Sequence, residues 1–319
     1  MNIRPFDFTN ADYTALLSIH QTLQPKVMLT IALLQEQDAE VSADNELIRV
    51  VGEIDNQVIA FGSYWYSPSD DEPHQFSLHV QPDFQNGTVP SQLHRYLLSK
   101  IEETQPRAIV SEPKENEEYR IQLLEADNFQ LKMRFPRSEQ SVNKLDLTKY
   151  DELIAQLEAQ GIEFITLTKA MNRDAEWQTN VWRMFTIIDQ DVPYPDPQKS
   201  VPFETYRTYY EGDSFRPDSW AIAWDSNEEG AQRYIGMSVV NMMATRPDAL
   251  YAGITGVVPS HRRRRIATAL KVCSAKYARE QGYDYIETDN EEGNPMLTLN
   301  LRLGFKPLPA WVYYEKLVG

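Results

Sequence analysis

Four consecutive arginines are the part of this sequence with the clearest chemistry. Arg262–Arg265 follow Pro259 and Ser260, which end an apolar run, and they precede a helical apolar stripe that begins at Ile266. This order places four cations at a helix N-terminus, which already carries the positive end of the helix dipole and unpaired N–H groups. A bound phosphate or pyrophosphate resolves that conflict. The alternative is that the arginines only form ion pairs with the acidic N-terminal half.

The overall charge limits which anions are plausible partners. The 319 residues include 31 Lys and Arg against 47 Asp and Glu, a net charge of −16. Such a chain repels nucleic acid and anionic membranes, so we expect neither as a partner. No apolar run approaches the ~20 residues that span a bilayer, and the start of the sequence lacks a signal peptide. We therefore expect a cytoplasmic protein.

Cysteine and histidine usage argues against metal or disulfide chemistry. Cys273 is the single cysteine, and the 5 histidines are scattered along the chain. No intramolecular disulfide can form, and no ligand spacing typical of a zinc site is present. We expect no metal.

Hydrophobic periodicity on both sides of the arginines predicts an α/β fold with a central, mostly antiparallel sheet flanked by helices. The C-terminal half is predicted to contain strands at 162–167, 219–226, 233–244, 251–258, 283–288 and 311–317, and helices at 174–189, 203–212, 266–277 and 295–303. The N-terminal half is predicted to contain strands at 2–6, 48–54, 57–67, 75–81, 108–113, 131–135 and 141–145, and helices at 11–23, 27–38, 89–101 and 117–127.

The two halves repeat at a near-constant offset. Pro82 aligns with Pro259 at a shift of 177, and Asn128 aligns with Gly304 at a shift of 176. An offset that persists over about 50 residues indicates an internal duplication, the alternative being a chance match of apolar residues. We expect two tandem modules, 1–147 and 159–319. They would form a monomer of pseudo-dimeric modules or a weak homodimer.

The segment around the arginines resembles the phosphate loop of the GNAT acetyltransferase superfamily. That loop follows a strand ending Val-x-Pro and reads Gln or Arg, two residues, Gly, one residue, then Gly or Ala. Here the strand end is Val257-Val258-Pro259, and the loop runs from Arg262 to Ala267 with Arg265 in the glycine position. We expect Arg265 to adopt an ordinary helical φ there, which leaves the loop undistorted, with its Cβ close to the ligand. The tandem organisation resembles that of mycothiol synthase.

The resemblance implies a CoA-dependent acyltransferase (an N-acetyltransferase). It would carry an acetyl group from acetyl-CoA to a primary amine of a small molecule. The implied acetyl-CoA contacts come from the strand end, the loop and two downstream asparagines: Gly256, Val257, Val258, Arg262, Arg263, Arg264, Arg265, Ile266, Ala267, Thr268, Asn290 and Asn294.

The resemblance also implies catalytic positions. The N–H of Val257 or Val258 would bind the thioester oxygen. Asn300 stands where many members have the tyrosine that protonates the leaving thiolate, and an amide cannot act as that acid. Water, another tyrosine or no acid would replace it, the candidate tyrosines being Tyr313 and Tyr314. The candidate bases are Glu287 and Asp289.

The acceptor side is less defined. The loop at 189–197 has carboxylates that suit a cationic amine, with tyrosines at 194, 206, 209 and 210, or it is simply a rigid acidic surface loop. In the N-terminal copy of the phosphate loop, Thr88 and Pro90 replace the glycine and the Gly or Ala, and no Lys or Arg occurs between residues 50 and 94. We expect that module to be degenerate. A non-catalytic acyl-CoA-binding scaffold is the alternative function.

Overall fold

The computed structural model describes residues 1–39, 41, 45–68, 72–195, 200–212 and 215–318. They fold into two compact units, one comprising Met1–Phe135 with Pro309–Gly319 and the other comprising Pro136–Leu308. We call these unit 1 and unit 2. The division differs from the expected boundaries at 147 and 159, because β6 (Gln130–Ser141) and β12 (Lys306–Leu317) each carry the chain from one unit into the other.

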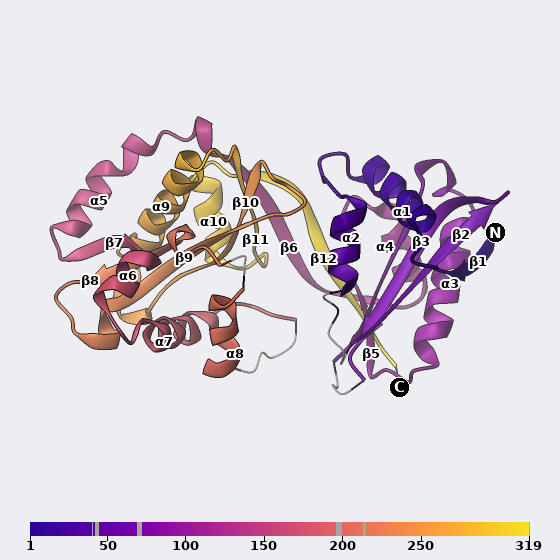
Figure 1. Cartoon of the computed structure of the whole chain (residues 1–319), viewed down its shortest axis with the longest axis horizontal. Coiled ribbons are helices and arrows are strands. Elements are labelled where there is room, and N and C mark those ends of the chain that lie inside the picture. Colours follow the sequence, from indigo (N-terminus) through magenta and orange to yellow (C-terminus); the bar gives the residue numbers. More distant parts are fainter. Residues whose placement is uncertain (40, 42–44, 69–71, 196–199, 213–214, 319) are drawn as a thin grey trace. The chain divides into compact units, whose positions relative to one another are not determined.

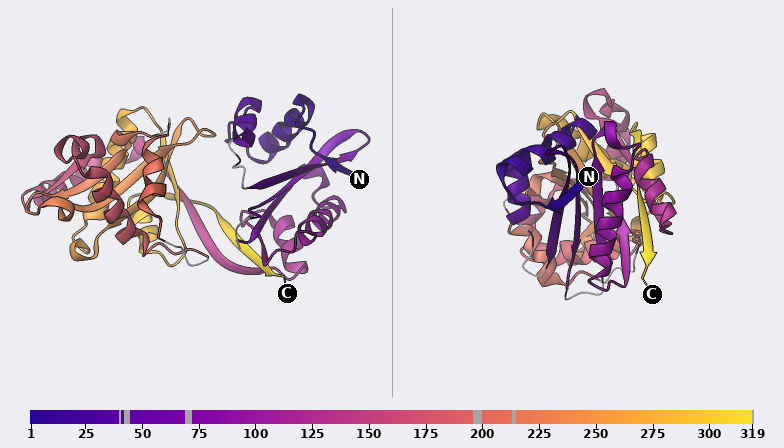
Figure 2. Two further views of the ribbon diagram at one scale, coloured as in Figure 1. Left: turned by 60° about the horizontal axis from the view of Figure 1, so that its bottom comes forward. Right: turned by 90° about the vertical axis from the view of Figure 1, so that its right-hand side faces the viewer.

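Unit 1 has a mixed sheet with helices on both faces. Helices α1 and α2 pack on one face, and α3 and α4 pack on the other (Figure 2). The strands occur in the order β1-β2-β3-β4-β5-β12, with β4 and β5 parallel. The bounds are β1 Asn2–Pro5, α1 Asn10–Leu23, α2 Ile31–Ala39, β2 Glu46–Ile54, β3 Gln57–Tyr66, β4 His74–Val80, η1 Pro82–Phe84, α3 Val89–Glu102, β5 Ala108–Ser111 and α4 Glu118–Ala126.

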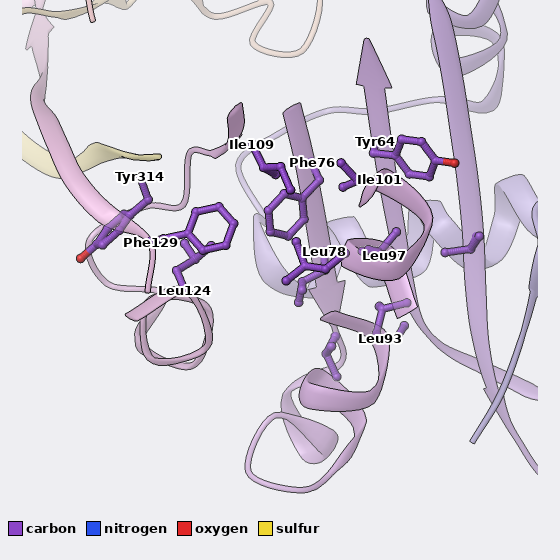
Figure 3. Packing of buried hydrophobic residues seen from close by; sticks show 14 of the residues in the cluster. Tyr64, Phe76, Leu78, Leu93, Leu97, Ile101, Ile109, Leu124, Phe129 and Tyr314 are labelled. Atoms are coloured by element: carbon purple, nitrogen blue, oxygen red, sulfur yellow. The ribbon is translucent and has the colours of Figure 1, made fainter. Parts of the chain in front are cut away.

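The larger core of unit 1 lies between its sheet and α3 (Figure 3). Leu93, Leu97 and Ile101 lie one helical turn apart on α3 and are fully buried, as the apolar stripe predicts. Tyr314 of β12 joins the same cluster and donates its hydroxyl to Glu125 at 3.0 Å. The last strand of the chain is therefore part of this core.

Unit 2 has the same kind of layering around the strands β6-β11-β10-β9-β8-β7. Helices α6, α7 and α8 lie on one face, and α5, α9 and α10 lie on the other (Figure 1). The bounds are α5 Asp151–Glu158, β7 Ile162–Thr166, α6 Leu167–Arg173, α7 Trp177–Asp189, α8 Phe203–Arg207, β8 Trp220–Asp225, η6 Gly230–Arg233, β9 Tyr234–Met242, β10 Ala249–Val257, η7 Pro259–His261, α9 Ile266–Glu280, β11 Tyr285–Asp289 and α10 Pro295–Arg302.

The two units repeat one order of elements, as the sequence offset predicts. The 3-10 turn η1 precedes α3 just as η7 precedes α9, and α4 and α10 each lead into a final strand. Asn128 and Gly304, the aligned residues that follow these last helices, both have a positive φ, of 64° and 89°.

The final strands are exchanged between the two halves of the sequence. Arg137–Ser141 of β6 pair with β11 in unit 2, whereas Tyr314–Leu317 of β12 pair with β5 in unit 1. β6 is one continuous strand, so the prediction of two separate strands at 131–135 and 141–145 was wrong.

Candidate functional site

Strands β10 and β11 separate in the middle of unit 2. Their parallel pairing runs only from Ala249–Tyr285 to Tyr251–Glu287, although β10 continues to Val257. A register shift between Ala252 and Thr255 bends β10 away at this point. An opening between two parallel strands is thus built into the sheet.

The arginine loop follows the end of β10 and begins α9. Ile266 is the first residue of α9, as predicted, and Arg265 is the N-cap residue without a side-chain hydrogen bond to the helix. Its φ of 64° lies in the left-handed region, so the expectation of an ordinary helical φ was wrong. Arg263 has a similar φ of 62°. Left-handed backbone is what glycine adopts at low cost, which explains why the resembling family has glycine at the position of Arg265.

A pocket of about 630 Å³ joins this helix N-terminus to the end of β10. The first-turn N–H groups of α9 have no partners within the helix, and Arg265 supplies no side-chain cap, so these donors suit an anion. The pocket is lined by Ile188, Asp191, Val192, Thr255, Gly256, Val257, His261, Arg262, Arg263, Arg265, Ile266, Ala267, Asn294, Pro295 and Met296.

Most predicted cofactor residues line this pocket. Gly256 is required by packing, because a Cβ there would lie 2.1 Å from Cγ2 of Ile188 in α7. Asn294 caps α10 by accepting the Met296 N–H at 2.9 Å. Val258, Arg264, Thr268 and Asn290 are not among the lining residues, and Arg264 donates to Gln160 at 2.8 Å.

The guanidinium of Arg262 has two partners in unit 2. Its Nε donates to the Val257 carbonyl at 2.9 Å, and its Nη2 forms an ion pair with Asp191 after α7. The partner therefore belongs to unit 2 and not to the acidic N-terminal half, so the ion-pair alternative does not describe this arginine. Among the described residues, the structure pairs neither Arg263 nor Arg265 with an acidic side chain.

The predicted catalytic residues occupy other environments. The Val258 N–H donates to the Ile235 carbonyl at 2.9 Å and is not free to bind a thioester oxygen. Asn300 is fully buried; its Nδ2 donates to Asn290 at 2.7 Å, whereas its Oδ1 has no hydrogen-bond partner among the described residues. The assignment of the Val258 N–H is corrected by its hydrogen bond to Ile235, and the role of Asn300 stays a prediction.

Glu287 is buried within an ion-pair cluster. Its carboxylate receives hydrogen bonds from Arg137 and, at 3.5 Å, from Arg246, which also binds Glu139 and Asp248. Two guanidinium groups on one carboxylate hold it as a structural anion, and this contradicts its predicted role as the base.

Sequence reasoning missed Tyr251. Its hydroxyl hydrogen-bonds Asp289 across the start of the β10–β11 opening. Burial, followed by the charge of Asp289, raises the pKa of Tyr251. A tyrosine before the strand bend gives no local signal, because it reads as an ordinary strand residue. Tyr313 and Tyr314 lie on the part of β12 that belongs to unit 1.

In unit 1 the equivalent positions hold larger side chains. At the 177-residue offset, His79 stands in place of Gly256 and Tyr119 in place of Met296. The Tyr119 hydroxyl is hydrogen-bonded by the backbone of Val80, and burial raises its pKa to about 12. Ring and phenol side chains thus occupy the strand end that a cofactor would need.

The acidic loop after α7 is described only up to residue 195, since residues 196–199 lie outside the described part of the chain. Its Tyr194 donates to Asp189 at 3.0 Å. In the described residues, no helix is long and apolar enough to cross a bilayer, and no three His, Cys, Asp or Glu side chains gather as metal ligands.

No family model and no curated protein matches the chain. Among solved structures, it is similar to a GCN5-related N-acetyltransferase from Sphaerobacter thermophilus, with a TM-score of 0.72, 14% identity, and coverage of 99% of this chain and 95% of that one. A tandem GNAT protein from the clavulanic acid biosynthesis pathway gives a TM-score of 0.72 and 13% identity, with coverage of 100% of this chain and 98% of that one. A glucosamine N-acetyltransferase region of a fungal β-N-acetylglucosaminidase gives a TM-score of 0.72 and 13% identity, with coverage of 99% of this chain and 38% of that one. The chain therefore has the tandem fold of GNAT N-acetyltransferases.

Proposed function

We propose that unit 2 is an acetyl-CoA-dependent N-acetyltransferase that acts on a primary amine of a small molecule. The observation that carries the proposal is the pocket that joins the α9 N-terminus to the opened strand β10. Backbone donors and the guanidinium groups of Arg263 and Arg265 at one end suit the phosphates of CoA. The strand edge at the other end, around Thr255, suits its amide-containing arm.

Unit 1 has a supporting role in this proposal. His79 and Tyr119 fill the positions that Gly256 and Met296 leave open in unit 2, and Pro90 removes an N–H from the first turn of α3. We therefore expect one acetyl-CoA per chain.

Calorimetric titration with acetyl-CoA tests the site, and thiol release over a panel of primary amines tests the activity. The expected stoichiometry is one, and Arg263→Glu should weaken binding at least tenfold, because it replaces an attractive charge with a repulsive one. A stoichiometry near two would show that unit 1 binds as well.

A non-catalytic acyl-CoA-binding scaffold is the second candidate. The engaged N–H of Val258 favours it, since this predicted group is unavailable to a thioester oxygen. Tight binding of acetyl-CoA without thiol release across the whole amine panel would support the scaffold.

A further inference from the structure

The opening between β10 and β11 carries one pair of polar side chains whose role the site description leaves open. Tyr251 is the last β10 residue paired with β11, and Asp289 is the last residue of β11. The hydroxyl of Tyr251 hydrogen-bonds Oδ1 of Asp289, so the pair bridges the two strands where they begin to separate.

The pair shares strand β10 with the pocket, although neither Tyr251 nor Asp289 is among the lining residues. Both use β10: the pocket reaches Thr255, and Tyr251 lies four residues earlier, across the strand bend. A ligand with its phosphates at the arginines and its arm along β10 would bring its other end toward the opening. Tyr251 is 36% exposed, so its side chain is partly open to solvent there.

Two other polar side chains near the opening are Glu287 and Asn300. Glu287 is held by Arg137 and Arg246, whereas Asn300 is fully buried and donates to Asn290. The charged groups that act on the Tyr251 phenol are Asp289, Glu287 and Arg137. Of these, Asp289 shares a hydrogen bond with Tyr251.

We propose that Tyr251 and Asp289 are the proton-transfer pair of the acetyl transfer. This inference rests on the proposed function. In the reaction, the amine nitrogen bonds to the thioester carbon, and the C–S bond breaks with its electron pair on sulfur. The ammonium form of the acceptor loses two protons overall. The first of these protons passes to Asp289. Tyr251 gives its own proton to the sulfur and takes up a proton from Asp289. The second proton of the ammonium group enters solvent.

The pair also predicts a property that needs no acceptor. If the phenol of Tyr251 donates to the sulfur of bound CoA, it stabilises the thiolate, whereas the charge of Asp289 destabilises it. Tyr251→Phe should then raise the pKa of the bound thiol by about one unit, and Asp289→Asn should lower it. Opposite shifts from two neighbouring residues are not expected from a general loss of structure.

The experiment is a pH titration of the thiolate ultraviolet absorbance of CoA bound to the full chain, with CoA affinity measured in parallel. Tyr285→Phe is the matched control. Tyr285 lies on β11, the strand that carries Asp289, but its ring packs against Arg246. Opposite shifts in the two variants, with an unchanged control, support the pair. Unchanged thiol pKa values with CoA bound, or the same shift in the control, overturn it. Failure of the wild-type chain to bind CoA would instead reject the proposed function.

With any amine found to be a substrate, Tyr251→Phe should lower kcat about a hundredfold and leave the affinity for acetyl-CoA unchanged. A fall in affinity with unchanged kcat would assign Tyr251 to cofactor binding and overturn its proton role.

Discussion

Arg262 forms an ion pair with Asp191. A carboxylate is therefore already paired with the guanidinium that the resemblance assigns to the pyrophosphate of the cofactor. Both residues line the same pocket, one from the phosphate loop and one from the segment after α7. If the proposed function is correct, the phosphate of acetyl-CoA and Asp191 compete for one cation.

Asp191→Asn should consequently tighten acetyl-CoA binding about three- to tenfold, because it removes the internal competitor and a repulsive charge. Asp189→Asn is the charge-matched control, since Asp189 binds Tyr194 instead of an arginine. Calorimetry of the three proteins at low and moderate salt checks this. Equal gains from both variants would mean that only long-range charge is involved.

The left-handed conformation of Arg265 predicts a trade between stability and binding. Arg265→Gly should raise the free energy of unfolding by about 1 kcal/mol, because glycine adopts a positive φ without steric strain. The same change should weaken acetyl-CoA binding, since a guanidinium that lines the pocket is lost. Denaturant titration and calorimetry measure the two effects. Tighter binding by the glycine variant would show that the arginine only crowds the site.

Local signals in the sequence predicted the elements well. The apolar stripe starting at Ile266 placed the start of α9, and the offset aligned Asn128 with Gly304, which the structure shows at equivalent turns. These features depend on neighbouring residues, which a sequence displays directly.

Features that depend on distant pairing were not predictable. The exchange of β6 and β12 follows from which strand edges meet, and nothing within either strand encodes its partner. The burial of Asn300 against Asn290 and the pairing of Glu287 with Arg246 likewise depend on packing between separate elements. Motif positions therefore predicted most residues that line the pocket, but not the contacts of the predicted catalytic residues.

Asn294 caps α10 and also lines the pocket, and two substitutions can separate the cap from the proposed contact with acetyl-CoA. Its side-chain oxygen caps α10 by accepting the Met296 N–H, and the residue lines the pocket. Asn294→Ala should lower the free energy of unfolding by about 1 kcal/mol and weaken acetyl-CoA binding. Asn294→Ser keeps a capping oxygen but lacks the amide N–H donors. It should restore stability while binding stays weak, and full recovery of both would limit the role of Asn294 to the cap.

Lys271 is a buried lysine on α9 that predicts a pH-dependent stability. It is 7% exposed, its Nζ lies 5.7 Å from the ring centre of Phe305, and burial lowers its pKa to about 8. At the 177-residue offset, His94 holds the same position in unit 1, where it is paired with Asp127 at 2.6 Å. The charged surroundings of the two positions thus differ, because no acidic side chain is paired with Lys271 among the described residues.

The sign of the effect follows from proton binding. In the unfolded chain the lysine titrates near 10.4, so between pH 8 and about 10.4 the unfolded state holds a proton that the folded state has lost. Stability therefore rises with pH across this window, and below pH 8 the full cost of burying the charge remains. Lys271→Met should be more stable than the wild type by about 3 kcal/mol at pH 7, a difference that shrinks toward pH 10. Lys276 of the same helix is only half-buried and pairs with Asp151, so Lys276→Met should show no such trend in denaturant titrations. A difference between wild type and Lys271→Met that stays constant with pH would show that the amine is not desolvated in the folded chain.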